Sequence, residues 1–242
     1  MGVERILRGV LNYRHSVQKL FQYELRDIKS HPNPSAVFIS CMDARLFPND
    51  FTLTKAGDMY VMRNAGNMAP PDELGRGATA AGVELGCIHN DIKDVIICGH
   101  SDCKAMALLW KLRDTIDTQR PDALSEWVRK YGRSSLKHYL AERDAQPMKF
   151  RSPIEGQSIS AHIDPDKRYQ PHDQLSQVHC LQQMINLTTY PFLSERLLQR
   201  RVRLSAMWFD VDSADVYMFS RATERFLVIC EDNIEKLLPE PL

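Results

Sequence analysis

Two short stretches of this 242-residue chain combine the residue types that bind transition metals. The first covers residues 41–45 (CMDAR) and the second covers residues 100–103 (HSDC). Zinc prefers cysteine sulfur and imidazole nitrogen, and a site with three such protein ligands keeps a fourth position open for water or substrate. Cys41, His100 and Cys103 therefore form a candidate zinc site of the open, catalytic kind.

The spacing within each stretch is compatible with this chemistry but is not specific by itself. A gap of two residues lets one turn present His100 and Cys103 to a single ion. The same sequence pattern also arises when a buried Cys lies near a hydrogen-bonded His and no metal is bound. Asp43 and Arg45 strengthen the metal hypothesis, because a paired guanidinium keeps a carboxylate ionised and oriented toward a metal-bound water. The alternative is an ordinary surface ion pair, which stabilises a protein by about 0–1 kcal/mol.

Each stretch follows an apolar run that is typical of a buried strand. Residues 36–40 (AVFIS) lead into Cys41, and residues 95–98 (VIIC) lead through Gly99 into His100. Open α/β sheets bind their ligands at the carboxyl ends of the strands. We therefore expect both stretches to meet at one edge of a sheet.

The remaining pattern alternates strands with helices, which favours an α/β fold with a mostly parallel central sheet flanked by helices. The pattern predicts one domain over 1–242, with an N-terminal helical arm over 1–30 and a divergent helical elaboration over 114–172. Further strands are expected at 59–62, 202–209, 215–220 and 225–229, the last two as a hairpin. Helices are expected at 3–28, 77–88, from about 103 past 109, at 173–189 and 191–200, and near the end of the chain.

The composition argues against several classes of partner. The 31 basic and 31 acidic residues balance, so there is no electrostatic case for nucleic acid or an anionic membrane. No apolar run approaches the roughly 18 residues of a membrane span, and the first 30 residues lack the apolar core of a secretory signal. We expect neither a nucleic-acid partner nor a membrane span.

Cysteine usage and the N-terminal charges bear on the cellular compartment. Six widely scattered cysteines indicate reduced thiols inside a cell rather than a disulfide framework. Four early basic residues against the single acid Glu4 are compatible with a mitochondrial presequence, and equally with an amphipathic helix of the mature fold. The expected location is mitochondrial or cytosolic.

Four motifs in order along the chain resemble the β-class carbonic anhydrases. They are the Cys41-x-Asp43-x-Arg45 pattern, residues 63–67 (RNAGN), residues 98–103 (CGHSDC) and residues 186–191 (NLTTYP). The resemblance is dense over about 30–110 and recurs at 175–210, and several motifs in the right order are far more specific than any one of them.

The resemblance implies a central four-stranded, mostly parallel sheet with an extended edge strand, and an N-terminal helix that packs on a partner subunit. It implies a homodimer or larger homo-oligomer with active sites near the dimer interface. It also implies reversible hydration of carbon dioxide, in which zinc-bound hydroxide attacks carbon dioxide, bicarbonate leaves and a proton passes to solvent.

Site residues carry over from the resemblance position by position. Cys41, His100 and Cys103 match the zinc ligands, and Asp43 with Arg45 matches the catalytic dyad. In some members of the family that Asp binds zinc and closes the site instead. Two thiolate ligands donate more charge than two imidazoles, so we expect a higher pKa for zinc-bound water than in an all-histidine site.

The sequence departs from the family pattern at three places. Lys104 follows the last ligand where a small residue is usual, His179 stands where Asn is usual, and residues 114–172 are longer and more divergent. Two other functions fit the same chemistry. One is a zinc hydrolase of the same fold that acts on carbon disulfide or carbonyl sulfide, and the other is a zinc-stabilised regulatory protein without turnover.

Other chemically capable residues have simpler interpretations. Gly66 lies either close to the zinc pocket or in a turn that needs positive φ. His89, just past a predicted helix, fits capping or solvent exposure better than proton transfer. His172 and His179, beside Cys180, could share a helix face as a second metal site, although solvent or interface positions are favoured. Core packing is expected for the remaining three cysteines, Cys87, Cys98 and Cys230.

Overall fold

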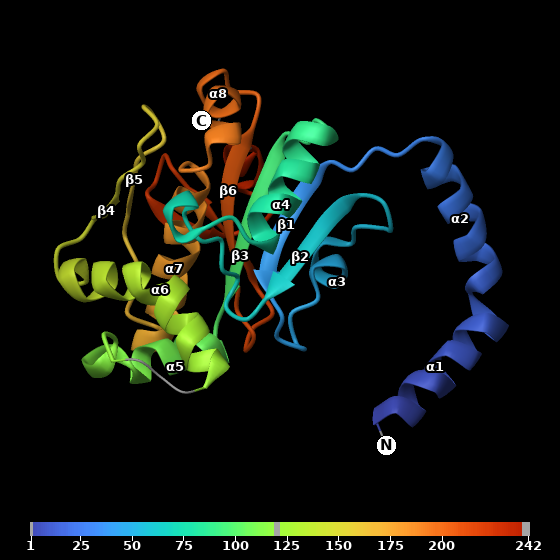
Figure 1. Ribbon diagram of the computed structural model, residues 1–242, viewed down its shortest axis with the longest axis horizontal. Helices are drawn as coiled ribbons and strands as arrows, with labels where there is room; N and C mark the ends of the chain where they lie inside the picture. The colour runs from blue at the N-terminus through green and yellow to red at the C-terminus, as the bar shows by residue number, and fades with distance from the viewer. Residues whose placement is uncertain (1, 119–121, 239–242) are drawn as a thin grey trace.

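A computed structural model of the chain describes residues 2–118 and 122–238. Its centre is a six-stranded sheet with the strand order β2-β1-β3-β6-β7-β8 (Figure 1). In this spatial order β2, β1, β3 and β6 are parallel to one another. β7 and β8 extend the sheet as the predicted antiparallel hairpin. The strands are β1 (Ala36–Cys41), β2 (Met59–Asn64), β3 (Asp94–His100), β6 (Arg203–Phe209), β7 (Val216–Ser220) and β8 (Arg225–Val228). The predicted α/β class with a mostly parallel sheet is confirmed.

The central strands are apolar because the sheet is covered on both faces. All six residues of β1 are buried, as expected for a parallel strand packed between neighbours and under helices. β1 pairs with β3 so that Ser40 lies opposite Cys98, which brings the carboxyl ends of both strands to one edge. β3 continues two residues beyond the predicted end at 98, and His100 pairs with Phe209 of β6.

Helices cover the two faces of the sheet unequally. α4 and α7 pack on one face, with α5 and α6 against α7 (Figure 1). Small residues bring α4 close to the sheet as predicted, because a Cβ at Gly82 would overlap the Met62 side chain of β2. The helices of the body are α3 (Pro48–Thr52), α4 (Ala78–Glu84), α5 (Lys104–Lys111), α6 (Ala123–Glu142), α7 (Pro171–Leu187), α8 (Pro191–Leu198) and α9 (Ile234–Leu237). No helix in the described part of the chain has the length and apolar character needed to cross a bilayer.

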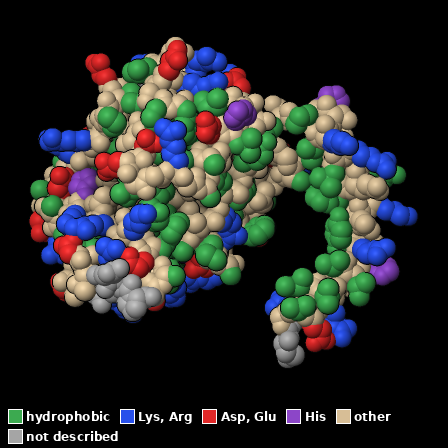
Figure 2. Space-filling view, viewed as in Figure 1, with side chains coloured by type: hydrophobic (Ala, Val, Ile, Leu, Met, Phe, Trp, Pro, Cys, Tyr) green, Lys and Arg blue, Asp and Glu red, His purple; other side chains and the backbone are tan. Residues whose placement is uncertain are grey.

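The N-terminal arm consists of two helices that project away from the body (Figure 1). They are α1 (Gly2–Ser16) and α2 (Gln18–Ser30), so the single helix expected at 3–28 is wrong in that it is interrupted at Val17. Neither helix contains a buried residue. Figure 2 shows apolar side chains along the side of the arm that faces the body. The large apolar residues of α1 and α2 that are more than half exposed are Val3, Ile6, Leu7, Val10, Leu11, Leu20 and Tyr23.

The segment 114–172 contains more than helix. After α6 it forms a second sheet of two short antiparallel strands, β4 (Met148–Phe150) and β5 (Ile159–Ala161). Three residues are too few to produce a recognisable period in the sequence, which explains why these strands were not predicted. Asp122 caps the N-terminus of α6, because its carboxylate accepts a hydrogen bond from the Ser125 backbone N–H. The side chains of α6 pack on α5 and α7.

Candidate metal centre

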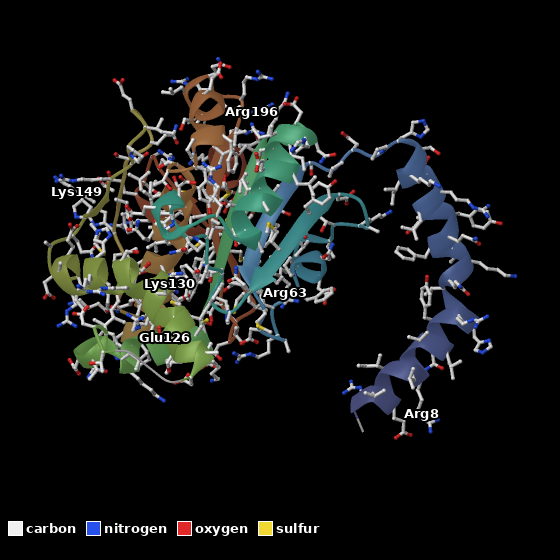
Figure 3. The ribbon with its side chains drawn as sticks, viewed as in Figure 1. Arg8, Arg63, Glu126, Lys130, Lys149 and Arg196 are labelled. Atoms are coloured by element: carbon white, nitrogen blue, oxygen red, sulfur yellow. The ribbon has the colours of Figure 1, made fainter. Side chains whose placement is uncertain are left out.

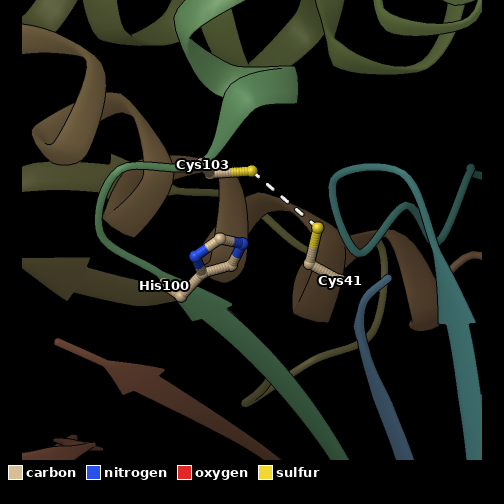
Figure 4. Close-up of side chains that lie close together, drawn as sticks. All are labelled: Cys41, His100 and Cys103. Atoms are coloured by element: carbon tan, nitrogen blue, oxygen red, sulfur yellow. Dashed lines mark hydrogen bonds between the residues drawn. The ribbon is translucent and has the colours of Figure 1, made fainter. Parts of the chain in front are cut away.

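The three predicted ligands meet at the carboxyl edge of the parallel sheet. Cys41 is the last residue of β1, His100 is the last residue of β3, and Cys103 immediately precedes α5. Their ligand atoms lie within 4.8 Å of one another, and the two sulfurs are 3.9 Å apart (Figure 4). All three residues are buried, with at most 5% of any of them exposed. The cluster has the donor set and the size of a zinc site with three protein ligands.

The orientation of His100 leaves one ring nitrogen for a metal. Its Nδ1 lies 2.8 Å from the Ser101 carbonyl oxygen, which can only accept, so Nδ1 carries the proton. Nε2 is then a free lone pair, and it is buried without a hydrogen-bond partner. A buried polar atom without a partner is costly, and a second-nitrogen hydrogen bond to a carbonyl is the usual support of a metal-binding histidine. The residues therefore fit a zinc ion.

One of the two thiols, Cys41, is already poised to give up its proton. The Cys103 thiol donates toward Cys41, and this interaction is the largest cause that lowers the pKa of Cys41 from 9.0 to about 4, against the opposing effect of burial. The Gly66 backbone N–H adds a hydrogen bond to Cys41 Sγ at 3.4 Å. The same sulfur–sulfur interaction raises the pKa of Cys103. Without a metal the pair is one thiolate and one thiol, and a divalent cation would replace the remaining proton.

Asp43 and Arg45 form a bidentate ion pair beside this cluster. Arg45 Nε donates to Asp43 Oδ1 at 3.0 Å, and Nη2 donates to Oδ2 at 2.8 Å. The guanidinium also donates to Asp102 Oδ2 at 2.7 Å, and Asp102 in turn contacts Lys104 Nζ at 2.9 Å. The hydrogen bonds from the Arg45 side chain hold the pKa of Asp43 well below its usual range. Asp43 is thus ionised at neutral pH, with both oxygens engaged by Arg45.

Arg63, at the end of β2, fixes the backbone that carries Cys41 and Asp43 (Figure 3). Its guanidinium donates to the carbonyl oxygens of Cys41 at 3.0 Å, Asp43 at 2.7 Å and Leu46 at 2.6 Å. Sequence reasoning placed Arg63 in a family motif but gave it no role. Three backbone acceptors along one loop make it the main side-chain support of the segment after β1.

Two carboxylates from other parts of the chain hold the loop that carries His100 and Cys103. Asp210, after β6, accepts a hydrogen bond from Ser101 Oγ at 2.9 Å. Asp173, in the first turn of α7, accepts from the Asp102 backbone N–H at 2.7 Å. Both carboxylates are buried, and sequence reasoning missed both because nothing local marks contacts across 71 and 109 residues.

The turn after β2 is supported from α7 and α6. Gly66 has φ +82°, and a Cβ there would lie 3.1 Å from Ala105 Cβ, so both sequence interpretations of this glycine hold. His179 lies 2.9 Å from the Gly66 carbonyl oxygen through Nε2 and 2.9 Å from Ser135 Oγ through Nδ1. Trp127 Nε1 donates to the Ala65 carbonyl oxygen at 2.8 Å.

His179 corrects a prediction. It was expected at a solvent or interface position, but it is fully buried. Burial lowers its pKa from 6.5 to about 4, so the imidazole is neutral at physiological pH. α7 lies between the sheet and the α5–α6 layer, so even its polar side chains are inside the protein.

The other candidates lie outside the cluster. Cys87 and Cys98 are buried as expected, whereas Cys230, also expected in the core, is exposed. His89 is exposed, and His172 lies beside Asp173 with a nitrogen–oxygen distance of 3.6 Å. Over residues 2–118 and 122–238 no second group of His, Cys, Asp and Glu ligands converges, so a second metal site near His179 has no support.

A Cys-His-Cys cluster at a parallel sheet edge, with an ionised carboxylate beside it, defines a metal-dependent enzyme of the water-activating kind. Comparison with known proteins gives the family. The carbonic anhydrase family model matches residues 36–216. β carbonic anhydrase 1 of Caenorhabditis elegans is 38% identical, with 98% of this chain and 92% of the relative aligned. The carbonic anhydrase of Pseudomonas aeruginosa is 28% identical over 93% of this chain and 91% of that protein.

Solved structures agree with this assignment at the level of the fold. The β-carbonic anhydrase CcaA superposes with a TM-score of 0.77 at 23% identity, covering 95% of this chain and 93% of that one. A tetrameric β-carbonic anhydrase from Sordaria macrospora superposes with a TM-score of 0.66 at 16% identity, covering 88% of this chain and 96% of that one. The chain belongs to the β-class carbonic anhydrases, and it is a lyase of that class.

Proposed function

We propose that the chain catalyses zinc-dependent, reversible hydration of carbon dioxide to bicarbonate and a proton at the Cys41–His100–Cys103 cluster. The observation that carries this proposal is the buried, unpartnered Nε2 of His100, which faces two cysteine sulfurs beside an ionised carboxylate. A cation bound by the two sulfurs would give this nitrogen the partner that it lacks. Zinc fits this donor set better than the hard cations, which prefer oxygen ligands.

Zinc bound here would supply Lewis acidity, which lowers the pKa of a water ligand toward the value of about 7 known for carbonic anhydrases with three His ligands. Two thiolates and a neutral imidazole would balance the charge of the ion. The Ser101 carbonyl fixes the His100 tautomer, and the Gly66 N–H helps to hold Cys41 as a thiolate. These contacts orient His100 and Cys41 and leave each with a free donor atom, whereas Cys103 would give up its proton when the ion binds.

Asp43 is the residue that we propose accepts a hydrogen bond from the attacking water. Arg45 holds both of its oxygens, which keeps the carboxylate charged and fixes its direction. This engagement also supports an open site, because Asp43 is not among the converging ligand atoms. Arg45 is itself anchored by Asp102, so the dyad has support that does not depend on the metal.

The test is stopped-flow carbon dioxide hydration on purified protein, with zinc content measured on the same sample from mildly acidic to alkaline pH. We expect one zinc per chain and a rate that rises with pH as the water ligand ionises. Full zinc occupancy without hydration at any pH would contradict the proposal. Such a result would favour a sulfur-containing substrate such as carbonyl sulfide, or a regulatory role without turnover.

We further propose that the arm packs on a second copy of the chain. Its apolar residues repeat at intervals of three and four, for example Val3, Leu7 and Val10, and each of these three is more than half exposed. An exposed apolar stripe of this length is unusual on a lone globular chain and indicates a protein interface. Multi-angle light scattering should give at least a dimer for the intact chain. Leu11→Asp should lower the mass, whereas Asn12→Asp on the neighbouring face should not.

Two broader proposals concern the domain organisation and the cellular compartment. We infer that 1–242 is one domain, because the arm and the 114–172 segment have no separate large core. We also propose a mitochondrial or cytosolic location, because the cysteines of the described chain are all free thiols and buried thiols of this kind persist in reducing compartments. Imaging of a C-terminally tagged protein would test the compartment.

A further inference from the structure

A polar hollow lies on the α7 side of the sheet, beside β7 and β8. Its volume is about 200 Å³, and its walls come from the loop at 162–169, from α7 and from the β7–β8 hairpin. None of the candidate ligands or the Asp43–Arg45 pair lines it. Its residues include Arg168, Gln177, Tyr217 and Arg225.

Gln177 is the most informative residue of this hollow. It is only 3% exposed, yet its side-chain amide makes no hydrogen bond to any residue that the structure describes. Its amide atoms are not among the fully buried polar atoms without a partner, so the amide reaches the space of the hollow. Its neighbour Ser176, in contrast, is bonded to the His100 carbonyl. The Gln177 amide is therefore a donor and acceptor that faces the hollow and is not used by the fold.

Two guanidinium groups add positive charge to the same space. Arg225 forms no ion pair within the described chain, and Arg168 forms only a long one, at 3.9 Å, with the largely exposed Asp166. Asp164, the other acid of the lining, offsets part of this charge, but its oxygens accept hydrogen bonds from the backbone N–H groups of Arg168 and Tyr169 and form no ion pair with either arginine. The two arginines therefore remain available to an anion.

The remaining walls limit what the anion is. The Tyr217 hydroxyl is buried and lies 3.1 Å from the Tyr169 hydroxyl, so it offers a further polar contact. Beside it, on the neighbouring strand β8, Phe226, Leu227 and Val228 provide an apolar part of the lining. The hollow thus offers charged and hydroxyl groups for an anion and an apolar surface for a short hydrocarbon group.

We propose that this hollow binds a small carboxylate. A carboxylate matches the planar guanidinium groups in a bidentate way, and its oxygens accept hydrogen bonds from the Gln177 amide and a tyrosine hydroxyl. Bicarbonate and short organic acids share this chemistry, and titrating each of them distinguishes the two kinds of ligand. The proposal does not depend on catalysis at the metal cluster, because it concerns binding alone.

Isothermal titration of the zinc-loaded full chain with acetate, propionate and bicarbonate tests the proposal. We expect the parent protein to bind one carboxylate per chain in the hollow. Gln177→Leu should lose this binding or show an affinity at least ten times weaker. Arg225→Met should have a similar effect, whereas Arg151→Met should not, because Arg151 is exposed and lies outside the hollow. Binding of a carboxylate at the metal cluster would be the same in the parent and in all three variants, so it would not affect the comparison.

The outcomes are distinct. Loss of a site for all three anions supports a general carboxylate site, and loss for acetate and propionate alone identifies organic acids as the ligands. Equal binding by the parent and both hollow variants would overturn the proposal, and so would an equal loss in Arg151→Met. Gln177→Leu replaces an unpartnered amide with an apolar group of similar size, so it should fold, and circular dichroism verifies this. Arg225→Met, at an exposed strand end, provides an independent variant.

Discussion

The buried His179 predicts a specific pH dependence of folding stability. Its pKa is lowered from 6.5 to about 4 by burial, so the folded protein keeps it neutral where the unfolded chain protonates it. Between pH 6.5 and 4 the unfolded state therefore binds more protons, and stability must fall as the pH falls through this window. Above pH 6.5 the contribution is fully present.

The magnitude follows from the gap between the two pKa values. Each pKa unit corresponds to about 1.4 kcal/mol, so His179 contributes roughly 3 kcal/mol over the whole window. About 2 kcal/mol of this should be lost between pH 6.5 and 5. The substitution His179→Asn removes the titrating group, and its amide remains able to donate to the Gly66 carbonyl, which His179 contacts at 2.9 Å.

Urea unfolding of both proteins, zinc-loaded and at equal concentration, measures this effect. The free energy of unfolding of the parent minus that of His179→Asn should decrease by about 2 kcal/mol from pH 7.5 to pH 5. Protonation of the metal ligands affects both proteins equally and cancels in this difference. If the difference is the same at both pH values, His179 does not titrate as its burial requires, and the reasoning is refuted.

Three further predictions concern the metal centre. Asp43→Asn should retain zinc but lose at least about 100-fold in kcat for hydration, because the amide cannot act as the charged acceptor; unchanged turnover would contradict the role. Cys103→Ala should lose zinc and activity together, as measured by metal analysis of the purified protein, and a fully active, zinc-replete variant would contradict the ligand assignment. Asp210→Asn should weaken zinc binding about 10-fold in competition with a chromophoric chelator, because Asp210 holds Ser101 through a charged hydrogen bond. The exposed Asp212→Asn serves as its control, and equal affinities of the two variants would exclude the support role.

The parts of the structure that the sequence predicted are those with a local signal. β1 and β3 are continuous apolar runs, so their carboxyl ends, and with them Cys41 and His100, could be placed at one edge. Asp43 and Arg45 are two residues apart and meet as expected. In each case the neighbouring residues in sequence determine the geometry.

The parts that could not be predicted depend on contacts between distant segments. Asp173 and Asp210 support the metal loop across 71 and 109 residues, and neither lies in a motif. His179 was misplaced because a polar residue on a helix normally faces solvent, whereas α7 is buried around most of its circumference. Only the packing of α5 and α6 over α7 reveals this.

The adjacency of β1 and β3 has a thermodynamic consequence for the whole chain. Cys41 and Cys103 are 62 residues apart in sequence, and the hydrogen-bonded sheet brings their sulfurs to 3.9 Å. An unfolded chain scatters these donors, so a zinc ion held at this site would be a ligand of the native state alone and would shift the folding equilibrium by mass action. Once free zinc exceeds its dissociation constant, each further tenfold rise adds about 1.4 kcal/mol to the free energy of unfolding. The melting temperature of this protein should therefore report the zinc supply around it.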